Sequence, residues 1–255
     1  MEQFSLSNLR LAVLIDADNV PYRAIKGILE ETALYGTPTI KRIYGDWTKP
    51  TVSGWKDVLL QNAIIPIQQY SYTTGKNATD SAMIIDAMDV LYSGKVDGFC
   101  LVSSDSDFTR LATRLREAGM KVIGIGETKT PNPFIVACDK FIYIEVLLSN
   151  YIDKQKEPSH EHPSRPERSA RVPDGIKKLI LASITDLADE DGWAFLGEVG
   201  NLLAKKQPDF DPRNFGFQKL TPLIKTLDEV EIDVRESNQP HIKHIYIRLR
   251  RAKEN

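Results

Sequence analysis

Acidic side chains follow two apolar runs of this 255-residue sequence, at the point where each run stops. The run 11–15 ends in Asp16, and the run 99–102 is followed closely by Asp105 and Asp107. Apolar runs of this length are typical of buried parallel strands, and such strands end at the same edge of a sheet. We therefore expect the three carboxylates to lie together at that edge, where ligands bind in open α/β sheets. Such a cluster repels itself unless a cation neutralises it.

A fourth acid, Asp80, opens the run 81–92, which is apolar around most of a helical circumference. We expect this helix to be largely buried, with Asp80 in its first turn at the same edge as the other acids. Asp86 follows about 240° further around the helix, so one helix face cannot present both carboxylates equally. We expect Asp86 to support the site or to pair with a basic residue.

The oxygen donors of this cluster determine the chemistry that it favours. Carboxylates are hard ligands that suit Mg²⁺ or Mn²⁺, and magnesium keeps several waters beside a bound phosphate. Ions held in this way activate water for attack on a phosphodiester, so no covalent nucleophile is needed. Because Asp and Asn also cap helices, a purely structural role stays open for each of them. The predicted catalytic residues and metal ligands are Asp16, Asp80, Asp105 and Asp107, and the predicted supporting residues are Asp18, Asn19, Asp86, Ser103 and Ser104.

Aromatic and basic residues follow the predicted strands at the same edge and suggest how a substrate is held. Tyr44, Trp47 and Tyr72 suit the stacking of unpaired bases, and Lys76 and Arg110 suit phosphates. The alternative for each aromatic residue is ordinary packing, and for each basic residue a solvated surface. We predict that these five residues bind substrate.

The order of the patterns along the chain indicates two domains. Strand and helix patterns alternate between residues 11 and 147, which predicts a three-layer α/β/α sandwich around a mainly parallel sheet. The segment 151–171 contains prolines and few apolar residues and is typical of a flexible linker. From residue 172, three helical patterns precede two runs that alternate with period two, which favours a winged helix-turn-helix. The predicted domains are 1–150 and 172–255.

Composition places few limits on function. A content of 42% hydrophobic and 27% charged residues is ordinary for a globular protein, and a net charge of −2 gives no global attraction to nucleic acid. The sequence has neither the pattern of a signal peptide nor about 18 consecutive apolar residues, so we expect a cytoplasmic protein with no membrane segment. Cys100 and Cys138 lack the spacing of metal ligands, and we expect neither a disulfide nor a zinc site.

Residues 11–147 resemble the NYN domain, a branch of the PIN-like nucleases, in its LabA-like group. The similarity lies in the motifs 14–19, 75–80 and 102–108, with Asp86, Asp89 and the segment 115–122. It implies a PIN-like (Rossmann-like) fold and a ribonuclease that depends on Mg²⁺ or Mn²⁺. The acids that match the family's metal site are Asp16, Asp80, Asp105 and Asp107, with Asn19 as their polar companion. A glycine is common in the family where this chain has Ser104.

The C-terminal segment resembles an OST-HTH (LOTUS) domain. The similarity lies in residues 192–194, in the segment 210–217 with Lys219 and Leu220, and in the closing hairpin. It implies an adaptor that binds RNA or protein, and the basic C-terminal end agrees with RNA. We therefore expect single-stranded RNA as the partner, and we leave open a protein partner of this domain and a homo-oligomer.

Three functions are compatible with these patterns. The first is a metal-dependent ribonuclease whose C-terminal domain selects RNA. The second is an inactive adaptor that uses the same acidic site only to hold RNA. The third is a phosphatase of the haloacid dehalogenase type, because Asp16 and Asp18 also resemble its nucleophile motif. The close spacing of Asp105 and Asp107 argues against the third.

Overall fold

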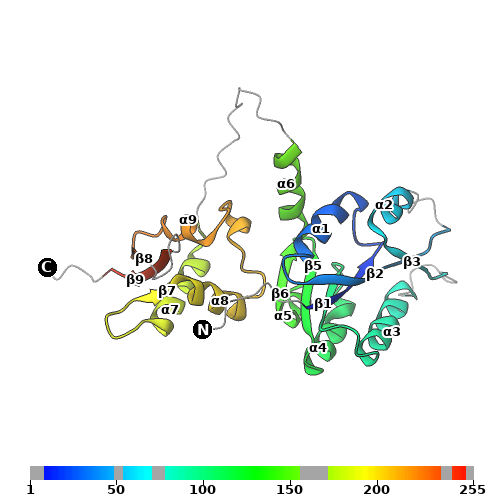
Figure 1. The fold of residues 1–255 in the computed structure, drawn as a ribbon, viewed down its shortest axis with the longest axis horizontal. Coiled ribbons are helices and arrows are strands. Elements are labelled where there is room, and N and C mark those ends of the chain that lie inside the picture. The colour runs from blue at the N-terminus through cyan, green and yellow to red at the C-terminus, as the bar shows by residue number, and fades with distance from the viewer. Residues whose placement is uncertain (1–8, 49–53, 71–77, 156–171, 237–242, 251–255) are drawn as a thin grey trace. The chain divides into compact units, whose positions relative to one another are not determined.

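The computed structural model describes residues 9–48, 54–70, 78–155, 172–236 and 243–250 (Figure 1). The chain divides into two compact units, Met1–Ser159 and His160–Asn255, and each is described by itself. In the first unit the last helix, α6 (Ile144–Gln155), ends inside the segment 151–171 that we predicted as a linker. Within the described part of the chain, no helix is both long and apolar enough to cross a membrane.

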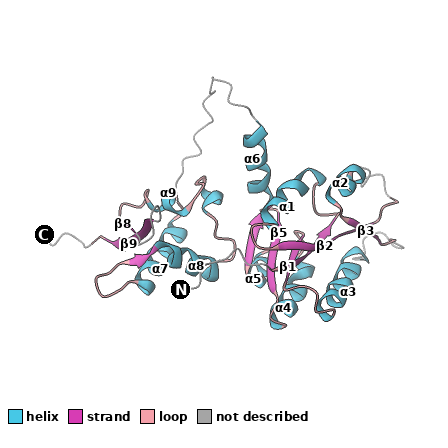
Figure 2. Ribbon diagram, viewed as in Figure 1, coloured by secondary structure: helices cyan, strands magenta, loops and turns pink. Residues whose placement is uncertain are grey.

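A six-stranded sheet forms the centre of the first unit, and every neighbouring pair in it is parallel (Figure 2). Its order is β3-β2-β1-β4-β5-β6, so β1 and β4 are neighbours although far apart in sequence. This arrangement confirms the predicted parallel α/β fold. The strands are β1 (Arg10–Asp16), β2 (Thr37–Gly45), β3 (Ile65–Gln68), β4 (Gly98–Val102), β5 (Lys121–Gly126) and β6 (Lys140–Tyr143).

Helices cover both faces of this sheet and complete three layers (Figure 1). One face packs against α1 (Ile25–Thr32), α2 (Trp55–Asn62) and α6 (Ile144–Gln155). The opposite face packs against α3 (Ala78–Tyr92), α4 (Thr109–Glu117) and α5 (Asn132–Ala137). Short 3-10 turns, η1 (Tyr22–Ala24) and η3 (Ser106–Phe108), precede α1 and α4.

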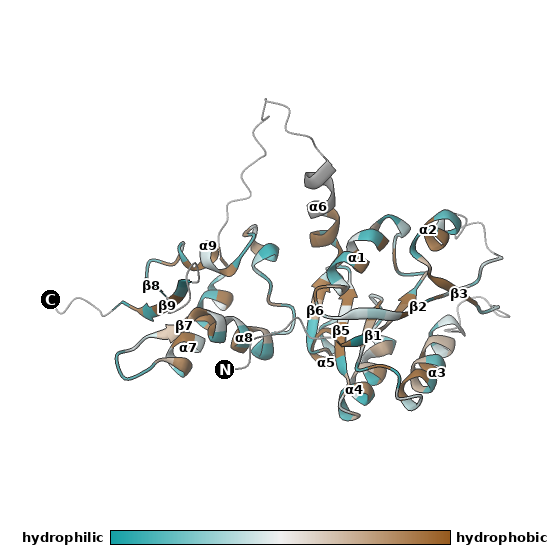
Figure 3. Cartoon of the chain, in the orientation of Figure 1, coloured by the Kyte–Doolittle hydropathy of each residue, from teal (hydrophilic) through white to brown (hydrophobic). Residues whose placement is uncertain are grey.

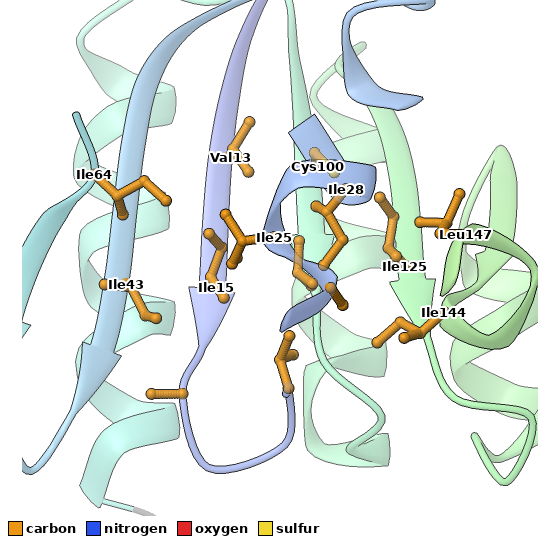
Figure 4. Packing of buried hydrophobic residues seen from close by; sticks show 14 of the residues in the cluster. Val13, Ile15, Ile25, Ile28, Ile43, Ile64, Cys100, Ile125, Ile144 and Leu147 are labelled. Atoms are coloured by element: carbon orange, nitrogen blue, oxygen red, sulfur yellow. The ribbon is translucent and has the colours of Figure 1, made fainter. Parts of the chain in front are cut away.

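Alternation along β1 divides its side chains between two hydrophobic cores. Val13 and Ile15 face α1, where they meet Ile25 and Ile28 (Figure 4). Ala12 and Leu14 face the layer that contains α3 and α4. All of these side chains are buried, and each large one contributes roughly 1.5–3 kcal/mol of hydrophobic stabilisation. Strand β5 is likewise hydrophobic, and all of its residues after Lys121 are buried (Figure 3).

Helix α3 is less covered than its apolar sequence predicts. Met83, Ala87 and Val90 pack into the core, but Ile85 is 63% exposed and Tyr92 is 73% exposed. The reason is that α3 belongs to an outer layer, so the sheet covers only one of its sides. The prediction of a helix buried around most of its circumference was therefore wrong for the outer side.

The second unit combines helices with a three-stranded antiparallel sheet of order β7-β9-β8. Its core contains Ile180, Val199, Leu203 and Ile247. The second of the three predicted helices is preceded by a strand of two residues, which is too short to show alternation. The elements are α7 (Asp174–Leu187), β7 (Ala194–Phe195), α8 (Leu196–Lys206), η4 (Pro212–Phe215), α9 (Leu220–Ile224), β8 (Val230–Glu236) and β9 (Lys243–Leu249).

Close packing of β5 against β6 leads to a prediction about Gly124. A Cβ atom there would lie 2.5 Å from the Phe141 ring and 2.8 Å from the Cys138 sulfur. We expect Gly124→Ala to lower the free energy of unfolding by about 1–3 kcal/mol because the core has no room for it. Thermal unfolding measures this change. Gly175→Ala, whose Cβ would have nothing within 4 Å, is the control, and an equal loss in both variants would contradict the packing argument.

Candidate metal centre

The centre lies at the carboxyl edge of the sheet, where β1 and β4 end side by side. Ile15 pairs with Val102, so Asp16, the last residue of β1, lies next to the loop that begins at Ser103. Ile15 faces α1, and the alternation along the strand turns Asp16 to the face that α3 covers. The parallel register thus places the first acid beside the loop that carries two more.

Asp16 is 1% exposed and is held by three hydrogen bonds. The Ser103 hydroxyl donates to Oδ2 over 2.9 Å, the Asn19 amide donates to Oδ2 over 2.6 Å, and the Asp18 backbone N–H donates to Oδ1 over 3.0 Å. Burial raises the pKa of the Asp16 carboxyl even though these donors favour its charged form. Ser103 and Asn19, two predicted supporting residues, therefore fix the direction of this carboxylate.

Asp80, Asp105 and Asp107 form the cluster with the geometry of a metal site. One carboxylate oxygen from each lies within 4.8 Å of the others. Asp80 comes from the first turn of α3, whereas the other two flank the start of η3. Asp105 also accepts the Asp107 backbone N–H over 2.9 Å as the N-cap of η3. Asp105 therefore belongs to the cluster and also caps η3, which is the structural role that we left open.

Electrostatic coupling joins Asp16 to this cluster, although it is not one of its three members. The pKa of the Asp80 carboxyl is raised to about 6, first by burial and then by the negative charges around it. Among those charges Asp16 contributes most, followed by Asp105, Asp107 and Asp18. A bound divalent cation relieves this repulsion, and an all-oxygen donor set suits Mg²⁺ or Mn²⁺. The residues present therefore fit such an ion.

Two predicted supporting residues have partners away from the cluster. The Ser104 hydroxyl accepts the Glu127 backbone N–H over 2.9 Å, so it ties the loop after β4 to the end of β5. Asp86 is bound by Arg42 and Tyr44 of β2. Asp18 is exposed next to Asp16. The roles of Ser104 and Asp86 are thus to join structural elements.

The predicted substrate-binding residues have different outcomes. Tyr44 is completely buried and its hydroxyl donates to Asp86, so the prediction that it stacks on bases was wrong. Trp47 is partly buried, and its indole N–H donates to the Ile67 carbonyl over 3.0 Å. Arg110 is exposed in the first turn of α4. Tyr72 and Lys76 lie outside the described residues.

An acid that the sequence reasoning missed lies at the end of β2. Asp46 is buried, and its carboxylate accepts from the Thr48 hydroxyl over 2.6 Å and from the Gln68 amide over 3.0 Å. Gln68 in turn accepts the Trp47 backbone N–H over 2.9 Å. The sequence did contain a signal, because Asp46 comes directly after the end of a predicted strand, where Asp16 ends another. These bonds make Asp46 an organiser of the loop that carries Trp47.

This architecture, a parallel α/β sandwich with acids at its carboxyl edge, is that of the PIN-like class. The sequence model of the NYN domain matches residues 10–145, and that of the OST-HTH/LOTUS domain matches residues 167–242. The chain therefore belongs to the NYN domain family, within the PIN-like nuclease superfamily, and carries a C-terminal OST-HTH/LOTUS domain. This membership removes the basis for a phosphatase of the haloacid dehalogenase type.

Solved structures from three bacteria are similar to parts of the chain. A protein of unknown function from Vibrio parahaemolyticus is 20% identical, with 56% of this chain and 96% of that chain covered and a TM-score of 0.46. An uncharacterized protein from Nitrosomonas europaea is 31% identical, with 40% and 95% covered and a TM-score of 0.31. A protein from Chromobacterium violaceum is 33% identical, with 34% and 90% covered and a TM-score of 0.26. No curated protein matches the chain.

The raised pKa of Asp80 predicts how stability depends on pH in the presence of chelator. The folded state binds the Asp80 proton more tightly than the unfolded state does. Protonation of Asp80 therefore stabilises the fold below about pH 4, and this stabilisation is lost as pH rises through about 6. We expect Asp80→Asn to raise the free energy of unfolding at pH 8 by about 1–2 kcal/mol, less than the full shift implies because water partly screens the site. The gain should vanish near pH 4. Denaturant unfolding at both pH values measures it.

Asp89→Asn is the control for this measurement, since Asp89 is exposed on the same helix. A similar gain in that variant at pH 8 would show that helix charge, and not repulsion within the cluster, is responsible.

Proposed function

We propose that the first unit is a ribonuclease that depends on Mg²⁺ or Mn²⁺ and cleaves phosphodiester bonds with an activated water. The observation that carries the proposal is the cluster of Asp80, Asp105 and Asp107, coupled to Asp16, within an NYN domain. An ion held there supplies a Lewis acid that polarises the phosphate and lowers the pKa of water. The LabA-like group, and a homo-oligomer, stay predictions.

The chain's own residues prepare the centre before an ion or RNA arrives. Ser103 and Asn19 hold the Asp16 carboxylate, and the cap of η3 holds Asp105. Carboxylates that are already oriented bind a cation without losing further side-chain freedom. We infer that Asp80, Asp105 and Asp107 hold the ion, and that Asp16 adds negative charge and a fixed acceptor beside it.

We propose that the OST-HTH domain contributes RNA binding through the outer side of its sheet. The Arg248 guanidinium lies 4.4 Å from the ring centroid of Trp193, and that of Arg235 lies 4.1 Å from the ring centroid of Tyr246. Aromatic rings and guanidinium planes stack on unpaired bases. Both arginines also pair with carboxylates of β8, so we infer that stacking, more than attraction to phosphates, supports the interaction. A protein partner of this domain is the alternative.

Cleavage of end-labelled single-stranded RNA tests the nuclease. We expect the full chain to cut in Mg²⁺ or Mn²⁺ and not in chelator, and we expect an Asp16→Asn/Asp105→Asn variant to lose at least about a hundredfold in rate. The control is Asp57→Asn/Asp89→Asn, which removes the same number of charges from exposed positions. Undiminished cutting by the first variant would overturn the assigned centre. RNA binding without any cutting by the wild type would identify an adaptor.

A further inference from the structure

Three side chains join α3 to β2 in a second polar cluster, which we call the α3 clamp: Arg42, Tyr44 and Asp86. The Arg42 guanidinium donates to Oδ1 of Asp86, and the Tyr44 hydroxyl donates to Oδ2. The Asp86 side chain is only 22% exposed and that of Arg42 only 30%. Burial raises the pKa of the Tyr44 hydroxyl, which therefore remains a donor. Both oxygens of Asp86 are thus occupied by donors from β2.

The α3 clamp lies directly beside the candidate metal centre. Tyr44 is the register partner of Asp16 in the pairing of β1 with β2, and its carbonyl accepts the Ala17 N–H over 3.0 Å. Asp86 follows Asp80 by about 9 Å along the axis of α3. The clamp therefore anchors α3 to the strand next to Asp16, and the same helix carries Asp80 in its first turn.

Asp80 needs such an anchor because its neighbours repel it. The negative charges of Asp16, Asp105 and Asp107 all act against its ionised form. Without an ion, this repulsion favours movement of the first turn of α3 away from β1 and η3. An ion pair and a hydrogen bond to a partly buried carboxylate oppose that movement, since breaking them leaves charged groups poorly solvated.

We propose that Asp86 is a positioning residue that, through Arg42 and Tyr44, holds α3 so that the Asp80 carboxylate stays in reach of a divalent cation. The inference rests on the metal centre of the proposed function. It assigns Asp86 no contact with the ion, because both its oxygens are engaged on β2 and it lies about 240° around the helix from Asp80. Asp86 acts through the helix and not as a ligand.

Mn²⁺ binding to the full chain, measured calorimetrically without RNA, tests the α3 clamp. Asp86→Asn removes the charge and presents an amide to one of the two donors, so we expect about tenfold weaker binding. Tyr44→Phe keeps the buried ring and removes only the hydroxyl, so we expect a smaller loss in the same direction. Asp89→Asn, on the exposed side of the same helix, is the matched control and should bind as the wild type does.

A double-variant cycle separates positioning from general damage. If Asp86 acts only through Asp80, then Asp86→Asn added to Asp80→Asn should change Mn²⁺ affinity by no more than about twofold. A further tenfold loss in that background would overturn the positioning role. Thermal unfolding in chelator checks that each variant folds, and Tyr44→Phe carries the test if Asp86→Asn does not fold.

The outcomes also distinguish the α3 clamp from the metal centre. No Mn²⁺ binding by the wild type would overturn the metal centre and with it the inference. Tight binding by the wild type and equally tight binding by folded Asp86→Asn and Tyr44→Phe would overturn the clamp alone. The inference requires that these two variants bind Mn²⁺ more weakly than the wild type. It also requires that Asp86→Asn causes no such weakening when it is added to Asp80→Asn.

Discussion

The parallel pairing of β1 with β4 determines where the acids of this protein lie. Because both strands run in the same direction, Asp16 and the loop from Ser103 to Asp107 emerge at one edge of the sheet. The Ser103 hydroxyl then joins the two strand ends by donating to Asp16. Other parts of the first unit serve this juxtaposition, since α3 brings Asp80 to the same edge and a second hydroxyl, that of Ser104, ties the loop to β5. The packed cores on both sides keep these strand ends fixed.

The sequence was sufficient to predict the fold and the acids because both depend on short-range patterns. Continuous apolar runs identify buried parallel strands, and the first acid after each run lies at the carboxyl edge by geometry. This reasoning placed Asp80, Asp105 and Asp107 at one edge, and the structure brings one carboxylate oxygen of each within 4.8 Å of the others. The structure also confirms the predicted α/β fold with its parallel sheet. The strand Ala194–Phe195 was too short to detect from the sequence.

The errors concern what covers a side chain, which depends on contacts between distant residues. Tyr44 lies at the predicted edge, but α3 packs over it and Asp86 binds its hydroxyl, so no substrate can reach the ring. Ile85 shows the opposite error, because it lies on a helix that we expected to be largely buried but is itself exposed. No element in the described part of the first unit covers the outer side of α3. Periodicity assigns a residue to a face of a strand or helix, but it does not show whether another element packs against that face.

The cap at Asp105 bears on how this family of folds can evolve. The carboxylate that belongs to the acidic cluster also accepts the N–H that begins η3. An asparagine at such a position accepts the same bond with its amide oxygen and carries no charge. A descendant of this chain can therefore lose one negative charge of the acidic cluster in a single substitution and keep the cap of the loop. The charge of the acidic cluster and the cap that begins η3 are therefore separable at this residue.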